Sequence, residues 1–462
     1  MEPSFLFEFE NGTLLLTPPS QEISEIPYCI WDSRVQKFRA KAFHYRPLLN
    51  WIIQRKFSYH DQARQYLEFP LSIARPQSPF PHQQEGLGAW LKEKKRGVVV
   101  LPTGAGKTYL ALMAMAETGR STLIVSPTLD LMNQWYDLLI AAFQQEIGIL
   151  GGGYHEIKPI TVTTYDSTYI HMGKMGNRFG LLIFDECHHL PGQAYSVSAQ
   201  WSLAPFRLGL TATPERGDGL DKSYPELIGP IVYRKEIHQL AGNYLASYQT
   251  RQLFVELSEA ERKEYQHHRE VYLQFLRSRN ISMSSPKGWQ RFIMESASDS
   301  QGRNAFLSYR RQKELASAAP AKIRLFEELL QKHTQDQILI FTNENQTVYQ
   351  LSKQFLIPSI THQTKTKERK LILDRFNEGI YPVIVTSKVL NEGINVPKAN
   401  IAIVLSGSGS TREHVQRLGR VLRKLENKKA ILYEVVTRDT NEEFVSDRRR
   451  EHTAYQQTEA QE

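Results

Sequence analysis

The sequence predicts an α/β fold with two tandem parallel-sheet domains, a small α+β domain before them and a helical insert between them. Strand-like and helix-like stretches alternate from residue 83 to about 239 and again from 321 to about 445, as in parallel sheets covered by helices. A glycine-rich loop joins the first of these strands to a helix. Between 240 and 320 the alternation gives way to long amphipathic patterns. We therefore expect domains over 1–75, 76–239, 240–320 and 321–445, with a polar tail over 446–462.

The bulk composition describes a soluble globular protein that works with a polyanion. Its 462 residues exceed one ordinary core and suit three or four domains of about 100–150 residues each. A formal charge of +8 and a pI near 9.2 favour nucleic acid as the partner. Two cysteines, Cys29 and Cys187, argue against a disulfide scaffold. Without a signal sequence or an apolar stretch long enough to span a bilayer, we expect a cytoplasmic protein with no membrane partner.

The N-terminal segment predicts a β-hairpin and a helix. Two apolar runs, Phe5–Glu10 and Thr13–Leu16, flank Asn11-Gly12, a dipeptide that favours the tight turn of a hairpin. Apolar and basic residues from 45 to 57 then follow a helix-like pattern. Three prolines after residue 75 indicate the linker to the next domain.

The glycine-rich loop is typical of a phosphate-binding loop. A β-branched strand ends at Leu101, where the strict pattern has its first glycine, and a helix-forming stretch follows the loop. Glycines let backbone N–H groups face a phosphate chain at the positive end of the helix. We expect Lys107 to reach the β- and γ-phosphates of ATP and Thr108 to bind Mg²⁺. The ATP-binding residues predicted in this loop are Thr103, Gly104, Ala105, Gly106, Lys107 and Thr108.

A pair of carboxylates follows another strand of the same domain. The strands are expected at Gly97–Leu101, Thr122–Val125, Thr161–Thr164, Leu181–Phe184 and Arg207–Leu210. Open α/β sheets place their ligands at the carboxyl ends of the strands. Asp185 and Glu186 follow the fourth strand, so we expect Asp185 to hold Mg²⁺ and Glu186 to activate water. A zinc site at Asp185, Cys187, His188 and His189 is the alternative, and it lacks the distant cysteine pair that would complete a tetrahedron.

The insert over 240–320 combines aromatic and basic residues. Ser258 and Glu261 form a predicted capping box, which opens a long amphipathic helix. Trp289 and Phe292 then lie among several arginines, which suits a surface that holds a nucleic-acid strand. An amphipathic insert with a solvated basic face explains the same pattern.

The second α/β domain has strands expected at Gln337–Phe341, Val383–Val385, Ile401–Leu405 and Ala430–Val435. It has no phosphate-binding loop of its own. It has instead Gln416, Arg420 and Arg423, at spacings that share one face of a helix. Arginines in a domain without its own nucleotide suggest fingers for ATP bound by the neighbouring domain.

In this order, these elements resemble a superfamily 2 helicase, with two RecA-like domains, from residue 83 to about 436. The residues that carry the resemblance are Gln83, Thr103–Thr108, Ser126-Pro127-Thr128 with Gln134-Trp135, Thr164-Tyr165, Asp185–His188, Thr211-Ala212-Thr213, Ile340–Asn343, Thr386 to Pro397 and Gln416 to Arg423. Among such helicases the chain is most similar to the XPB family in its short bacterial and archaeal form. The segment with Trp31-Asp32-Ser33 resembles that family's damage-recognition domain, and the insert takes the place of its thumb.

The resemblance implies a role for each motif. Gln83 would sense adenine, and the predicted catalytic residues are Lys107, Asp185, Glu186, Gln416, Arg420 and Arg423. DNA would be held through its backbone near Thr128, Thr164, Thr342 and Thr386. Hydrolysis would be coupled to movement through His188, Thr211, Thr213, Arg216 and Asp218. Gly217 and Asn395 depart from the family pattern, where Glu and Asp are expected, which puts strand separation and ATP–DNA coupling in doubt.

The sequence thus predicts an ATP- and Mg²⁺-dependent DNA helicase or translocase that moves 3′ to 5′, with a role in DNA repair. Two other classes stay open. One is a double-stranded DNA translocase that drives a nuclease, restriction or defence complex without separating strands. The other is an ATP-gated nucleic-acid clamp. Either motor would work with a nuclease or repair partner protein.

Overall fold

Two compact units, Met1–Lys235 and Glu236–Glu462, make up the computed structural model. It describes residues 4–20, 25–285, 287–387, 399–407 and 429–450. No helix in these ranges is long and apolar enough to cross a membrane.

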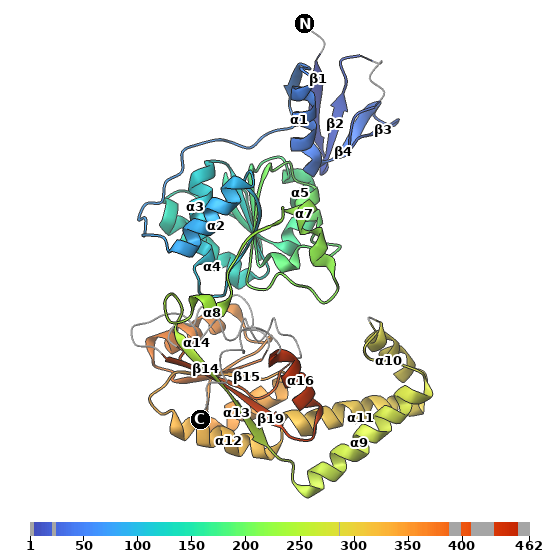
Figure 1. Ribbon diagram of the computed structural model, residues 1–462, viewed down its shortest axis with the longest axis vertical. Helices are drawn as coiled ribbons and strands as arrows, with labels where there is room; N and C mark the ends of the chain where they lie inside the picture. The colour runs from blue at the N-terminus through green and yellow to red at the C-terminus, as the bar shows by residue number, and fades with distance from the viewer. Residues whose placement is uncertain (1–3, 21–24, 286, 388–398, 408–428, 451–462) are drawn as a thin grey trace. The chain divides into compact units, whose positions relative to one another are not determined.

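The first unit begins with a five-stranded sheet in the order β3-β4-β2-β1-β5 (Figure 1). The predicted hairpin is present, since β1 and β2 pair antiparallel around Asn11 and Gly12, which both have the positive φ that a tight hairpin turn needs. Helix α1 buries Tyr45, Leu48 and Ile52 in the core of this domain. The elements are β1 (Phe5–Glu10), β2 (Thr13–Thr17), β3 (Ile30–Asp32), β4 (Lys37–Lys41), α1 (Tyr45–Gln54) and β5 (Tyr59–Asp61).

The rest of the first unit, called the first lobe, is an eight-stranded sheet in the order β13-β6-β12-β11-β7-β10-β8-β9 with helices on both faces (Figure 1). Neighbouring strands pair parallel, apart from the antiparallel β8–β9 pair. All five predicted strands are present. The elements are α2 (Pro81–Lys92), β6 (Arg96–Val100), α3 (Lys107–Thr118), β7 (Thr122–Ser126), α4 (Leu129–Phe143), β8 (Gly148–Gly151), β9 (Tyr154–Glu156), β10 (Ile160–Thr164), α5 (Tyr165–Met175), β11 (Leu181–Asp185), α6 (Val197–Gln200), β12 (Phe206–Thr211), α7 (Tyr224–Leu227) and β13 (Ile231–Arg234).

The second unit contains a six-stranded sheet in the order β14-β19-β18-β15-β17-β16, parallel throughout, which we call the second lobe. All four predicted strands are present. The elements are α8 (Ile237–Leu240), β14 (Ser247–Val255), α12 (Pro320–Lys332), β15 (Ile338–Phe341), α13 (Asn345–Phe355), β16 (Ser359–Ile360), α14 (Thr366–Glu378), β17 (Val383–Thr386), β18 (Ile401–Val404), β19 (Lys429–Thr437) and α16 (Asn441–Arg450).

Two predicted boundaries differ from this arrangement. The expected helical insert began at 240, but Ser247–Val255 is a strand that pairs with β19 along its whole length. As an edge strand it is only partly buried, so it lacks the continuous apolar run of the central strands. The expected polar tail began at 446, but α16 continues to Arg450.

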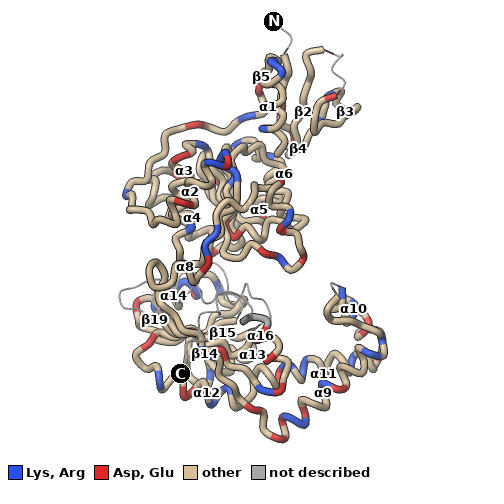
Figure 2. The backbone as a smooth tube through the Cα atoms, viewed as in Figure 1, with Lys and Arg blue, Asp and Glu red and all other residues tan. Residues whose placement is uncertain are grey.

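The helical part of the insert is an arm of three helices, α9 (Glu259–Ser278), α10 (Gly288–Ser296) and α11 (Ser300–Ser317). Helices α9 and α11 lie side by side, with α10 at their far end (Figure 1). The predicted capping box is present, since the Glu261 carboxylate accepts from the Ser258 backbone N–H at 2.8 Å. Acidic and basic residues are interspersed along α9, whereas basic residues predominate on α11 (Figure 2).

Candidate active site

The loop after β6 has the backbone of a phosphate-binding loop. Gly104 and Gly106 have φ of 87° and 80°, a region that disfavours residues with a Cβ. Gly106 caps the first turn of α3, and a Cβ added there would lie 2.2 Å from Nε2 of Gln83. Glycine is therefore favoured at this position, and it leaves the positive end of a twelve-residue helix facing the carboxyl edge of the sheet.

Lys107 lies between this loop and the acidic strand end. Its Nζ donates to the carbonyl oxygen of Leu101 at 3.1 Å and lies 4.0 Å from Oε1 of Glu186. Both side chains are nearly buried, with 10% and 13% of their surfaces exposed. The predicted lysine and the predicted general base are thus brought together although 79 positions separate them in sequence.

Asp185 ends β11 and is buried beneath the site. Its Oδ2 accepts from Nε1 of Trp135 at 2.8 Å and its Oδ1 from the backbone N–H of Glu186 at 3.0 Å. Burial, and next the nearby Glu186 carboxylate, raise the pKa of Asp185. A buried carboxylate whose ionised form is disfavoured gains from a cation, so Asp185 fits a role as a Mg²⁺ ligand. Trp135 was predicted as part of a motif, but its role in orienting Asp185 was not predicted.

Glu186 has a strained backbone. Its φ of 45° lies in the left-handed region, which costs a residue other than glycine about 1–3 kcal/mol. This turn directs the carboxylate of Glu186 toward Lys107 while Cys187 packs in the apolar core. The alternative zinc site would need Cys187 and Asp185 to face one point, and the buried position of Cys187 in the core does not favour it.

The predicted coupling residues form a connected chain. Nδ1 of His188 lies 3.4 Å from Oε2 of Glu186 and 3.0 Å from Oγ1 of Thr211, and Oγ1 of Thr211 accepts from the backbone N–H of Thr213 at 3.2 Å. Arg216 donates to the carbonyl oxygen of His188. Contacts therefore run from the predicted general base to the loop after β12.

Arg216 also forms a two-bond ion pair with Asp218, with distances of 2.9 and 2.6 Å. These hydrogen bonds lower the pKa of Asp218 to about 2. Gly217, between them, has open space where a Cβ would lie. A glutamate would therefore fit at this position.

Three family models match this chain, and together they cover most of its length. The Xeroderma pigmentosum group B helicase damage recognition domain matches residues 7–63. The type III restriction enzyme res subunit matches 77–216, and the ERCC3/RAD25/XPB C-terminal helicase matches 303–459.

Curated relatives agree with these matches. A DNA 3′-5′ translocase XPB2 of Sulfurisphaera tokodaii is 43% identical over 421 residues, which cover 91% of this chain and 95% of that protein. The chain belongs to the XPB family. A DNA 3′-5′ helicase XPB of Mycobacterium tuberculosis is 32% identical over 77% of this chain and 60% of its own length.

A solved structure shares the fold of this chain. The Pyrococcus furiosus Hef helicase domain superposes with a TM-score of 0.52 over 80% of this chain and 97% of that one. At 19% identity the likeness concerns the fold alone. The predicted fold class and family are therefore confirmed.

The two threonines predicted to contact DNA in the first lobe of this XPB-family chain are helix caps. Oγ1 of Thr128 accepts from the backbone N–H of Leu131 at 3.3 Å, and Oγ1 of Thr164 from that of Ser167 at 3.2 Å. They begin α4 and α5, which follow the neighbouring strands β7 and β10. Two positive helix ends thus lie at one edge of the sheet, which suits backbone phosphates.

Sequence reasoning missed a glycine run beside these two caps. Gly151, Gly152 and Gly153 all have positive φ and form the turn between β8 and β9. A Cβ at Gly151 would lie 2.8 Å from Oγ of Ser167, and one at Gly152 would lie 3.1 Å from Leu129. The signal was three successive glycines between two strand-like runs, at the edge where the helices begin.

Thr342 and Thr386, the DNA-contact residues predicted in the second lobe, are fully buried at strand ends. Oγ1 of Thr342 bonds to Oγ of Ser406 at 3.0 Å, and Oγ1 of Thr386 donates to the carbonyl oxygen of Ile360 at 3.0 Å. Their hydroxyls therefore hold the lobe together, and direct contact with a phosphate stays a prediction.

The remaining predicted residues divide into two groups. Gln83 uses both ends of its amide within the protein, since it accepts from the backbone N–H of Phe80 at 2.8 Å and donates to the carbonyl oxygen of Gly106 at 3.0 Å. It thereby ties α2 to the phosphate-binding loop. Asn395, Gln416, Arg420 and Arg423 lie outside the described residues.

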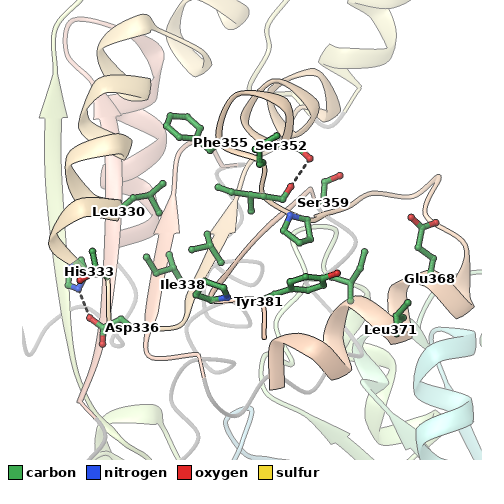
Figure 3. Close-up of a pocket in the computed structure, with 17 residues that line it drawn as sticks. Leu330, His333, Asp336, Ile338, Ser352, Phe355, Ser359, Glu368, Leu371 and Tyr381 are labelled. Carbon is green, nitrogen blue, oxygen red and sulfur yellow. Dashed lines mark hydrogen bonds and ion pairs between the residues drawn. The ribbon is translucent and has the colours of Figure 1, made fainter. Parts of the chain in front are cut away.

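A cavity of about 890 Å³ in the second lobe lies away from the carboxyl edge (Figure 3). Ile338 and Val383, which line it, are the first residues of β15 and β17, so the cavity is at the amino ends of these strands. Two of its polar side chains bond to each other, with Nδ1 of His333 2.7 Å from Oδ2 of Asp336. We assign no chemistry to this cavity.

Proposed function

We propose that this XPB-family chain is an ATP-hydrolysing motor that moves 3′ to 5′ along DNA and opens the duplex. One observation carries the proposal. Lys107, Asp185 and Glu186 meet at the carboxyl edge of the first lobe, beside a loop whose positive φ at Gly106 favours glycine. The relatives named for 3′-5′ helicase or translocase activity support the direction of movement.

Different residues of the first lobe would bind the phosphates, hold Mg²⁺ and activate the water. The backbone N–H groups at the start of α3 and the ammonium of Lys107 would bind the phosphates of ATP. Thr108 and Asp185 would hold Mg²⁺, which neutralises charge on the phosphate oxygens when bound. The carboxylate of Glu186 would orient the attacking water and accept its proton.

The second lobe would complete this site with arginines. Arg420 and Arg423, with Gln416, are proposed to reach ATP only when the lobes close. Their support is the arginine spacing in a domain without its own phosphate-binding loop. Such arginines are worth about 10³–10⁵ in rate in other phosphoryl-transfer enzymes.

DNA would lie along the carboxyl edge of the first lobe. The capped starts of α4 and α5 and the glycine turn Gly151–Gly153 offer backbone N–H groups to phosphates. Such contacts carry no sequence information, so binding is expected to be sequence-independent and to weaken with salt. We expect the chain to act on DNA in the cytoplasm, with a nuclease or repair protein as its partner.

The arm would separate strands. A groove of about 340 Å³ runs between the arm and α13 of the second lobe, and Trp289, Tyr309 and Arg310 line it. Trp289 is 45% exposed, and its ring centroid lies 5.3 Å from that of Tyr309. An exposed ring next to an arginine can stack on an unpaired base, worth about 1–3 kcal/mol per base.

Strand separation is tested with Trp289→Ala on a 3′-tailed fork. We expect normal basal ATP turnover and fewer base pairs opened per ATP, by severalfold. Leu307→Ala is the matched control, because Leu307 is 54% exposed on α11 but does not line the groove. An unchanged ratio in Trp289→Ala would make the groove a packing feature.

A second candidate is translocation on duplex DNA without strand separation. Gly217, which replaces the carboxylate of the family pattern, favours it, as does the translocase name of the Sulfurisphaera relative. A motor of this kind displaces the third strand of a triplex but leaves a fork intact. Comparing the two substrates therefore decides between the candidates.

A further inference from the structure

A second polar cavity lies in the first unit, between the N-terminal domain and the first lobe. It has a volume of about 410 Å³, within the range of about 300–1,000 Å³ for small-molecule sites. It lies between α1 and residues at or next to the first residues of β7 and β12, at the edge of the sheet opposite the phosphate-binding loop. We call it the junction pocket. Its lining includes Arg46, Asn50, Tyr59, Arg64, Arg120 and Phe206.

Arg46 enters the junction pocket without a carboxylate partner within the described residues. Its NH1 donates instead to the carbonyl oxygens of Lys94 at 3.0 Å and Pro205 at 3.2 Å. These bonds join α1 to the first lobe while the guanidinium keeps its full charge. Burial, and next the charge of Arg120, lower the pKa of Arg46.

More positive charge lies behind Arg46. Arg96 and Arg207 also donate to main-chain carbonyl groups, those of Ile228 and Leu227 among them. Burial lowers the pKa of Arg96 to about 10, with Arg46 as the second cause, and burial with Arg96 lowers that of Arg207. The three guanidinium groups thus repel one another in a partly buried setting.

Cations also surround one aromatic ring of the pocket. The centroid of Phe206 lies 4.6 Å from the guanidinium carbon of Arg120, 5.5 Å from that of Arg46 and 5.2 Å from Nζ of Lys95. Tyr59, 42% exposed, also lines the pocket. An aromatic surface thus lies next to the cations.

The carboxylates of this region do not balance this charge. Asp61 accepts from the hydroxyl of Tyr45 at 2.5 Å and from the backbone N–H of Ala63 at 3.0 Å. Glu68 pairs with Arg120 at 2.8 Å and with Arg64 at 3.4 Å. Two acids therefore face four cations, Arg46, Arg64, Lys95 and Arg120.

We propose that the junction pocket is a second phosphate-binding site, which takes one nucleotide, with its phosphate on Arg46, Arg64 and Arg120 and its base against Tyr59 or Phe206. Arginine clusters next to aromatic rings favour this ligand, since guanidinium groups bind phosphate oxygens in pairs and rings stack on bases. The phosphate belongs either to a DNA strand or to a free mononucleotide. This site is separate from the ATP site and does not depend on the proposed motor function.

Charge reversal at the rim of the pocket tests the proposal. Asn50 is exposed on α1 and lines the pocket, so Asn50→Glu puts a negative charge there without disturbing the core. Gln54→Glu is the matched control, because Gln54 is exposed on the same helix but outside the lining. The full chain, without added ATP or ATP analogue that could itself enter the pocket, is titrated with dTMP and with 5′-phosphorylated and 5′-hydroxyl dT oligonucleotides. The ATP site is the same in both variants, so it does not distinguish them.

We expect Asn50→Glu to weaken binding of at least one phosphorylated probe about five- to tenfold, and Gln54→Glu to change it less than about twofold. An effect on dTMP assigns the site to free nucleotides as well, whereas an effect on oligonucleotides alone assigns it to a strand. Arg64 is another exposed residue that lines the pocket, and Arg64→Gln should also weaken binding of that probe. Equal affinities of Asn50→Glu and Gln54→Glu for every probe would overturn the proposal, whatever the ATPase activity.

Discussion

The two lobes have the same kind of parallel sheet, but the polar groups at the carboxyl edges of the two sheets have different surroundings. In the first lobe Asp185 is buried with a raised pKa, Glu186 has a left-handed backbone, and Lys107 reaches Glu186 only at 4.0 Å. In the second lobe Lys322 bonds to Glu442 at 2.5 Å and Thr342 to Ser406 at 3.0 Å. The carboxyl edge of the first lobe thus holds two neighbouring carboxylates, whereas the polar groups named in the second lobe are paired with one another. Strain of this kind is typical of functional sites, so we expect the first lobe to bind ATP and activate the water.

The largest effect on ATP turnover should come from Lys107 and Glu186, at the carboxyl edge of the first lobe. Lys107→Ala should abolish ATP turnover because the phosphates lose their ammonium partner. Glu186→Gln should bind ATP with near-normal affinity but fail to hydrolyse it, as measured by phosphate release and nucleotide retention. Wild-type turnover in Glu186→Gln would remove the water-activating role from this residue.

The next largest effect on ATP turnover should come from the arginines that the second lobe is proposed to add to the ATP site. Arg420→Ala and Arg423→Ala should leave nucleotide affinity nearly intact and reduce DNA-stimulated turnover about 10³-fold or more. Lys429→Ala, outside the predicted arginine motif, is the control. If the arginine variants lose DNA binding alone, these residues belong to the DNA-binding face.

The free energy of unfolding of variants at the two carboxyl edges tests the difference between the lobes directly. Asp185→Asn removes a buried charge, and its amide oxygen still accepts from Trp135, but its amide nitrogen cannot accept from the backbone N–H of Glu186. The gain and the loss should nearly cancel, so the unfolding free energy of the nucleotide-free protein should change by less than about 1 kcal/mol. Glu442→Gln takes the carboxylate from buried Lys322 and should lose about 1–3 kcal/mol.

Asp137→Asn, an exposed carboxylate on α4, should change stability by less than about 0.5 kcal/mol. Denaturant unfolding of the three variants without nucleotide gives these values. Destabilisation by Asp185→Asn equal to that by Glu442→Gln would mean that both edges are built alike.

The smallest expected effect is at Gly217. Gly217→Glu restores the carboxylate of the family pattern, and the open space around the glycine accommodates it without unfolding. We expect a gain of a few-fold in base pairs opened per ATP on a 3′-tailed fork. Gly219→Glu is not an equivalent control because Gly219 has positive φ, so Asp221→Glu nearby serves instead. A gain in both variants would show a nonspecific effect of the loop.

The central strands and the backbone of the glycine-rich loop could be predicted from the sequence because both depend on local patterns. Runs such as Leu181–Phe184 are apolar because helices cover both faces of the sheet, and Gly106 is fixed by the loop itself. Edge strands were missed, as β14 shows, since they are half exposed.

Contacts between distant segments were also not predictable. The bond from Trp135 to Asp185 joins residues 50 positions apart, and the burial of Thr342 depends on Ser406. Neither has a local signal. The arginines of the junction pocket come together only because α1 packs against the first lobe.

The most direct test of the account is ATP hydrolysis by the wild-type chain with and without DNA, with fork opening measured in the same reaction. We predict turnover that rises many-fold on DNA and opening of 3′-tailed but not 5′-tailed forks. An ATP hydrolysis rate that DNA does not change, or ATP binding without hydrolysis, would contradict the assignment of a DNA motor.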